Sequence, residues 1–94
     1  MPVSKKRLVH IIACMYYYGA EVVIDDVNSE CYIYVPNSND LEIFWEEVDC
    51  LIDSNIIELE SGCSEEGQER RTFTLSNEAK QKVCACVDKK AAKN

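Results

Sequence analysis

The sequence predicts a small α+β domain with the order helix, hairpin, helix, hairpin, helix. Three stretches carry apolar residues at helical spacing, and two pairs of β-rich runs are separated by turn-forming or loop-forming residues. The chain has 94 residues, of which 47% are hydrophobic, enough for one core. We therefore expect a single domain over residues 1–88, followed by a disordered tail over residues 89–94.

The first helix is expected over residues 5–18. Ser4 can cap its beginning, and Gly19 is a left-handed stop at its end. One apolar stripe consists of Leu8, Ile11, Ile12 and Met15. Because Val9, Cys14 and three tyrosines make the helix apolar almost all round, we expect it to be central or partly covered by a second subunit.

A hairpin is expected from the runs 21–27 and 31–35, joined at Asn28-Ser29. Side chains alternate between the two faces of a strand. The second run should therefore place Cys31, Ile33 and Val35 on one face and Tyr32 and Tyr34 on the other.

The second helix is the element around which the chain is organised. Asn39 should cap it, Glu42 stands in the capping-box position, and Asn55 is a natural left-handed end. Helical spacing predicts a core face made of Leu41, Phe44, Trp45, Val48, Leu51 and Ile52. A neighbouring face should stack four acidic residues, here called the carboxylate ridge: Glu42, Glu46, Asp49 and Asp53.

A second hairpin is expected from residues 56–60 and 70–75, with residues 62–69 as its loop. Ser76 or Asn77 can then cap a last helix. Its apolar side should consist of Ala79, Val83, Cys86 and Val87.

Two segments, LIDSNIIE at residues 51–58 and RRTFTLSNEAK at residues 70–80, have the spacing of a helix end, a strand, a return strand and a helix start. Residues 41–83 thus resemble the second half of a winged-helix domain, and the resemblance implies a winged-helix-like fold. The chain departs from that family in having strand patterns where the family has another helix. Its ridge helix also carries acids where a recognition helix reads bases with Arg, Lys, Asn or Gln.

Charge is strongly segregated along the chain. The formal net charge is −7, and residues 8–69 contain fifteen carboxylates but no Lys or Arg. Such an interior would repel nucleic acid, so a basic surface on another protein is the expected partner. The expected partner-binding residues are Glu42, Glu46, Asp49, Asp53, Asp25, Asp26, Glu58, Glu60, Glu65 and Glu66.

The carboxylate ridge alone is too sparse to copy duplex DNA. Helical rise spaces its charges about 4.5–6 Å apart, whereas duplex DNA carries a charge about every 1.7 Å. Acids from other segments would have to share the same side of the molecule. An ordinary solvated acidic surface is the competing interpretation.

No enzyme, cofactor or metal chemistry is expected. Cys84 and Cys86 would point about 200° apart on a helix and are interpreted as buried small residues, like the other cysteines. His10 stands alone and is expected at the surface or an interface, and the adjacent Asp25 and Asp26 should point to opposite faces of a strand. With no recognisable signal peptide or membrane span, we expect a reduced cytoplasmic protein, in the host cytoplasm if it is viral.

In size, acidity and lack of catalytic motifs the chain resembles phage-encoded inhibitors such as anti-CRISPR and anti-restriction proteins. The leading hypothesis is a non-enzymatic DNA-mimic-like protein that inhibits a nucleic-acid-binding protein by occupying its basic groove, without binding nucleic acid or membrane itself. Tyrosines left outside beside carboxylates would add an aromatic and acidic surface suited to an Arg-rich or Lys-rich face. The alternatives are a dimeric winged-helix transcription regulator contacting DNA through Arg70, Arg71 and the terminal lysines, and an assembly module whose first helix forms a homodimer.

Overall fold

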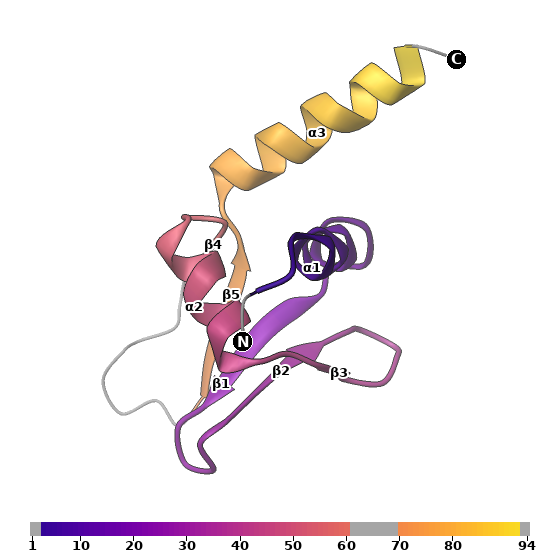
Figure 1. Ribbon diagram of the computed structural model, residues 1–94. Helices are drawn as coiled ribbons and strands as arrows, with labels where there is room; N and C mark the ends of the chain where they lie inside the picture. The colour runs from indigo at the N-terminus through magenta and orange to yellow at the C-terminus, as the bar shows by residue number, and fades with distance from the viewer. Residues whose placement is uncertain (1–2, 61–69, 93–94) are drawn as a thin grey trace.

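The protein is a small α+β domain, seen in a computed structural model that describes residues 3–60 and 70–92 (Figure 1). Its described part has three helices and one antiparallel sheet with the strand order β3-β2-β1-β5-β4. The predicted α+β class is therefore confirmed. The elements in order are α1 (Lys5–Tyr18), β1 (Glu21–Asp25), β2 (Glu30–Tyr34), β3 (Leu41–Glu42), α2 (Trp45–Asp53), β4 (Ile57–Leu59), β5 (Arg70–Leu75) and α3 (Asn77–Ala92).

Helix α1 has the ends that its sequence predicts. The Ser4 hydroxyl accepts a hydrogen bond from the Arg7 amide at 3.4 Å. Gly19 ends the helix with a left-handed φ of 68°, and its N–H bonds to the Cys14 carbonyl. Both signals are local, so they do not depend on how the rest of the chain packs.

The left-handed conformation of Gly19 leads to a stability prediction. A Cβ at this position would meet no atom within 4 Å, so Gly19→Ala should lower the free energy of unfolding through backbone strain alone, by about 1–2 kcal/mol. Gly19→Asn should cost less, because asparagine tolerates this region. Urea denaturation measures both, and equal midpoints for wild type and Gly19→Ala would contradict the prediction.

Helix α2 begins later than the sequence predicted. Leu41 and Glu42 lie in strand β3, opposite Ile33 and Tyr32 of β2. The helix starts at Trp45, and its capping-box acid is Glu47, which accepts a hydrogen bond from the Phe44 amide at 2.9 Å. The predicted cap at Asn39 and capping-box role of Glu42 are therefore wrong.

This shorter helix also presents a different buried face. Val48 and Leu51 are buried as predicted, and Glu47 is buried beside them. Ile43, just before the helix, fills a core position with 3% exposure. The predicted core residues that instead stand partly in solvent are Leu41 (38% exposed), Phe44 (51%), Trp45 (43%) and Ile52 (37%).

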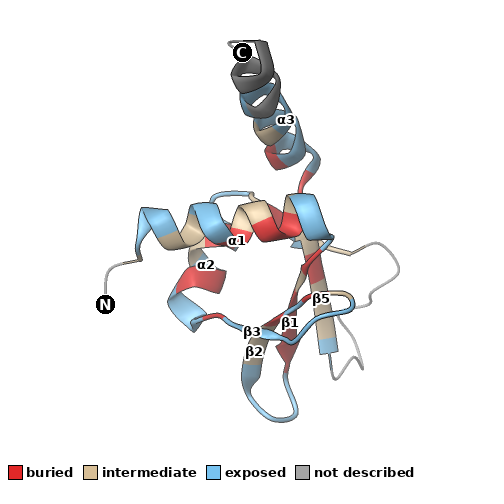
Figure 2. Ribbon diagram, turned by 90° about the vertical axis from the view of Figure 1, so that its right-hand side faces the viewer, coloured by how far each residue is buried: buried red, intermediate tan, exposed pale blue. Residues whose placement is uncertain are grey.

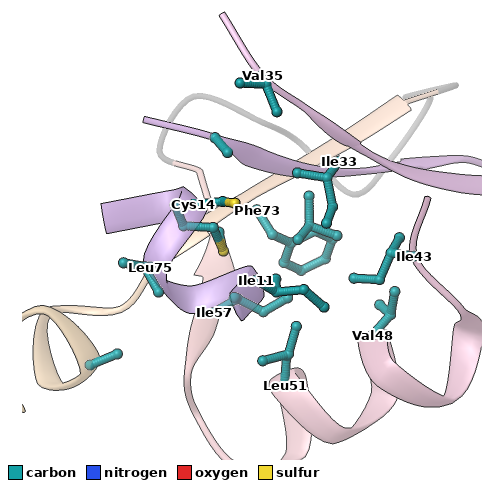
Figure 3. Close-up of a cluster of buried hydrophobic side chains, with 14 of the residues drawn as sticks. Ile11, Cys14, Ile33, Val35, Ile43, Val48, Leu51, Ile57, Phe73 and Leu75 are labelled. Carbon is teal, nitrogen blue, oxygen red and sulfur yellow. The ribbon is translucent and has the colours of Figure 1, made fainter. Parts of the chain in front are cut away.

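The core lies between the sheet and helices α1 and α2, which cover one face of the sheet (Figure 2). In Figure 3, side chains from both helices and from the strands point toward one another. The core includes Ile11 and Met15 from α1, Val48 and Leu51 from α2, and Val22, Ile24, Ile33, Val35, Ile57, Phe73 and Leu75 from the strand segments.

The two faces of strand β2 alternate as predicted. Ile33 and Val35 are buried in the core, and Cys31 packs against it. Tyr34 is 45% exposed on the opposite face, and Tyr32 is half-buried there. Cross-strand partners share a face, so the register Tyr34↔Glu21 and Tyr32↔Val23 places Glu21 and Val23 on the tyrosine side.

Helix α3 extends away from the body of the domain (Figures 1 and 2). Ser76 caps it, since its hydroxyl accepts from the Ala79 amide at 3.1 Å and donates to the Asn55 carbonyl at 2.6 Å. Ala79 is buried, Val83 is half-buried and Cys86 is exposed, so the predicted apolar side is covered mainly near its beginning. The helix runs from Asn77 to Ala92.

Candidate protein-binding surfaces

The solvent side of α2 combines acids with large apolar side chains. We call Trp45, Glu46, Asp49, Ile52 and Asp53 the outer face of α2; all five are exposed. At about 100° per residue they fall within an arc of about 120°. Three of the four carboxylate-ridge residues are therefore on this face, while the fourth, Glu42, lies on β3.

The carboxylates of this outer face form no ion pair with any described residue. The ion pairs in residues 3–60 and 70–92 join Arg7 to Glu47, Arg70 to Asp25 and Arg71 to Asp26. Helix α2 itself carries no Lys or Arg. The negative charge on this face is therefore not compensated by the described residues.

Helix α2 is fixed to α1 by one buried acid, Glu47. Its carboxylate accepts two hydrogen bonds from the Arg7 guanidinium, at 2.8 and 3.1 Å, besides that from the Phe44 amide. Arg7 also donates to the Glu42 carbonyl at 2.9 Å and lies 5.6 Å from the centre of the Phe44 ring. These contacts hold the outer face of α2 in a fixed orientation on the domain.

The hydrogen bonds between Arg7 and Glu47 shift both groups toward their charged forms. The Arg7 bond is the main reason why the pKa of Glu47 is lowered, with the Phe44 amide contributing. The bond to Glu47 likewise raises the pKa of Arg7. The set of acids expected from the sequence leaves Glu47 out; the available signal was its position three residues after Phe44, the spacing of a capping box.

The negative charges of α2 also affect the pKa of the Cys31 thiol on β2. Burial is the main reason why the pKa of this thiol is raised, and the charges of Glu47, Asp49 and Glu46 raise it further. The thiol donates to the Ile43 carbonyl at 3.4 Å. Cys31 therefore stays protonated and acts as a small packing residue.

Two predicted partner-binding acids are already bound within the chain. The buried Asp25 carboxylate accepts from the Val27 and Asn28 amides at 3.0 and 3.2 Å and from the Asn28 side chain at 2.9 Å. The Asn28 side-chain bond is the largest cause of its lowered pKa. Asp26 pairs with Arg71 at 3.1 Å. Asp25 thus shapes the β1–β2 turn and is not presented to a partner.

The sheet face opposite the core gathers a second set of predicted acids. Glu58 and Glu60 belong to this face through their pairing with Thr74 and Thr72. Glu21 of β1 lies on the same face, on the other side of β5. No sequence signal indicated this, because the proximity of Glu21 to Glu60 depends on the order of strands from distant parts of the chain. Burial mainly raises the pKa of Glu21, and the charge of Glu60 adds to the rise. The remaining predicted acids, Glu65 and Glu66, lie outside the described residues.

The cysteines differ in burial from what the sequence suggested. Cys14 is buried, and Cys31 and Cys50 are half-buried. Cys84 and Cys86 are exposed, so the prediction that they are buried is wrong. Cys86 lines an open hollow between α3 and α1, so the two helices do not close over it. His10 is exposed on α1, with its Nε2 atom 3.9 Å from the Cys14 sulfur.

Across residues 3–60 and 70–92, no three His, Cys, Asp or Glu residues are grouped so that they could hold a metal ion. None of the helices in that part of the chain has the length and apolarity to cross a bilayer. Comparison with protein-family models, curated proteins and solved structures finds no match.

Proposed function

We propose that this chain is a non-enzymatic acidic binding protein that occupies the basic, nucleic-acid-binding groove of another protein and thereby inhibits it. The observation that carries the proposal is the outer face of α2, where three carboxylates without a cation partner among the described residues stand beside Trp45 and Ile52. Phage-type anti-defence activity is the biological setting that the small size and acidity favour.

The composition of the outer face suits a basic protein surface. Trp45 is 43% exposed and Ile52 37% exposed, and aromatic side chains such as tryptophan are enriched among residues that dominate binding energy. Acids beside them can pair with Arg or Lys, and an Arg stacked on Trp45 would gain a cation–π contact. The fixed orientation given by Glu47 lowers the ordering cost of binding.

The spacing of these acids limits how far the outer face of α2 can imitate the charge pattern of DNA. Glu46, Asp49 and Asp53 lie about 4.5 and 6 Å apart along the helix axis, so they cannot reproduce the phosphate spacing of duplex DNA. We infer that the contact engages a few basic side chains of the groove. Trp45 and Ile52, the apolar residues of the outer face of α2, supply the rest of the interface.

A charge-reversal pair tests the proposal. Asp49→Lys with Asp53→Lys should weaken partner binding at least tenfold, because it replaces attraction by repulsion at a basic surface. Positive charge is favourable near a helix C-terminus, so the fold should persist. The partner is captured on immobilised protein from a lysate of the source or host cells, identified by mass spectrometry, purified and titrated calorimetrically, with duplex DNA as competitor.

The matched control changes the net charge of the protein by the same amount, but at two positions outside α2. Glu30→Lys with Asp40→Lys alters two exposed acids outside α2 and should leave affinity within about twofold. Duplex DNA should displace the partner from wild type. Unchanged affinity of the α2 variant with its circular dichroism intact, or a partner that duplex DNA cannot displace, would refute the proposal.

The alternative function is a winged-helix DNA-binding regulator. It draws support from the element order α2, β4, β5 and α3 and from Lys80 and Lys82, which are exposed on α3. Arg70 and Arg71 are paired with Asp25 and Asp26, which leaves them less available for phosphates. Binding to random duplex DNA that weakens steeply with salt would favour this alternative over the acidic inhibitor.

A further inference from the structure

The open hollow between α1 and α3 is an apolar groove. It has a volume of about 350 Å³, and it stays open because α3 extends away from the body of the domain (Figures 1 and 2). Val9 and Tyr17, two large side chains of its α1 side, are each more than half exposed. We call it the α1–α3 groove; the residues that line it include Val9, Ile12 and Tyr17 of α1 and Lys82, Val83 and Cys86 of α3.

The side chains around this groove carry positive charge, although the formal net charge of the chain is −7. Lys82 lines it, and Lys5 and Lys6 precede Val9 by four and three residues, so they lie on the same side of α1. All three lysines are exposed, and none forms an ion pair within residues 3–60 and 70–92. Helix α1 contains no Asp or Glu, and Glu78, one turn before Lys82, lines a separate hollow beside β4. An occupant of the α1–α3 groove should therefore present apolar side chains together with acids.

The outer face of α2 has this composition. Trp45 and Ile52 are seven residues apart on one side of the helix, about 10.5 Å along its axis. Val9 and Tyr17 are eight residues apart on α1, about 12 Å, so the two apolar pairs extend over similar lengths. The acids of the outer face stand next to Trp45 and Ile52 and have no cation partner among the described residues.

The two surfaces can meet only between molecules. No described residue of α2 lines the groove of its own molecule, and the hydrogen bonds between Arg7 and Glu47 hold the helix in place. Two grooves facing each other would bring the lysines of both copies together, which is unfavourable. A second copy therefore fits the groove through its α2 and not through its α1.

We propose that a second copy of this chain places the outer face of its α2 in the α1–α3 groove. Trp45 and Ile52 of one molecule cover the apolar groove residues of the other, and the acids beside them face the lysines. Because the two surfaces differ, the contact is heterologous, so it is either made twice in a closed pair or continued into longer chains. The inference does not require the basic partner of the proposed function; such a partner would compete with the second copy for the same face of α2.

The test measures self-association of the whole chain by sedimentation equilibrium. A reducing agent is present because Cys84 and Cys86 are exposed and could otherwise form disulfides between molecules. The mean mass should rise with protein concentration over the micromolar to millimolar range. The control that changes charge outside both surfaces, Glu30→Lys with Asp40→Lys, should alter the dissociation constant by less than about twofold.

Two charge-reversed variants test the two surfaces separately. The acid-reversed variant is Asp49→Lys with Asp53→Lys, and the groove-reversed variant is Lys6→Glu with Lys82→Glu. Each should raise the dissociation constant for self-association at least about tenfold, because like charges then face each other. Glutamate is favourable in the first turn of α1 and Lys82 is exposed, so the groove-reversed variant should fold, which circular dichroism verifies.

An equimolar mixture of these two variants should associate again. The positive α2 of the acid-reversed variant meets the negative groove of the other, and the remaining α2 and groove keep their native charges. The dissociation constant of the mixed complex should therefore return to within about threefold of the wild-type value. Loss of structure in either variant could not produce this recovery. Amide shift changes in the isotope-labelled mixture should be confined to α1, α2 and α3.

A wild type that stays monomeric throughout this concentration range would overturn the inference. A mixture that associates no better than either variant alone, or shift changes centred on the sheet, would do the same. These outcomes leave the proposed function standing, because it needs only the outer face of α2. The groove-reversed variant keeps that face and should bind the captured basic partner with unchanged affinity, whereas loss of partner binding alone would count against the proposed function and not against self-association.

Discussion

Replacing Leu51 with alanine is expected to lower the free energy of unfolding by about 2–5 kcal/mol, the range for a large aliphatic side chain removed from a packed core. Leu51 is 0% exposed and lies in the cluster between α1, α2 and the sheet. Urea denaturation followed by circular dichroism measures the loss.

The neighbouring residue provides the control for the orientation of α2. Ile52 is 37% exposed, so Ile52→Ala should cost less than about 1 kcal/mol. The sequence pattern assigned both residues to the core, whereas the structure buries one of them. Equal losses for the two variants would mean that the helix packs as the pattern predicted.

Glu47→Ala should also destabilise the domain strongly, by about 2–4 kcal/mol. The change removes a buried carboxylate that joins Arg7 to the beginning of α2, and hydrogen bonds to charged groups are each worth about 1.5–3 kcal/mol. Partial exposure of Arg7 keeps the loss below that of a fully buried pair. Glu46→Ala, which removes an exposed acid from the adjacent position, should change stability by less than about 0.5 kcal/mol.

The role of Glu47 also has a pH signature. Its pKa is lowered in the folded state, so its contribution is complete above the unfolded-state value of about 4.3 and is lost as the pH falls through the folded-state pKa. The stability difference between wild type and Glu47→Ala should therefore shrink on acidification below about pH 4. A difference that stays constant to pH 2 would contradict this assignment.

The parts of the fold that depend on local signals could be predicted from the sequence. Ser4 and Gly19 bound α1 because each acts within its own turn of chain. Alternation in β2 placed Ile33 and Tyr34 on opposite faces, and Asn55 adopts the left-handed conformation expected of it, with φ of 58°.

The start of α2 could not be predicted because distant residues decide it. Burying Ile43 and pairing Leu41 with Ile33 require extended chain up to Phe44, although helical spacing alone would allow an earlier start. Glu47 is buried because Arg7, forty positions earlier in the chain, neutralises it.

The candidate surfaces could be predicted only where their residues are neighbours in the sequence. Charge spacing on one helix identified Glu46, Asp49 and Asp53, since these residues are neighbours in sequence and share an exposed face. The association of Glu21 with Glu60 depends on strand order, and the pairing of Asp26 with Arg71 joins residues from two separate hairpins. The amino-acid composition gives the number of such acids, but it does not show which of them are paired with a Lys or Arg.

The extension of α3 from an acidic body separates opposite charges in space. The helix contains four lysines against two acids, whereas residues 8–69 contain no Lys or Arg. A molecule of this kind has a permanent dipole moment. The field of the basic partner that we propose would therefore exert a torque that turns the negative end of the molecule forward during encounter. Association with such a partner should consequently be fast at low ionic strength and slow down as salt is added, while dissociation changes much less.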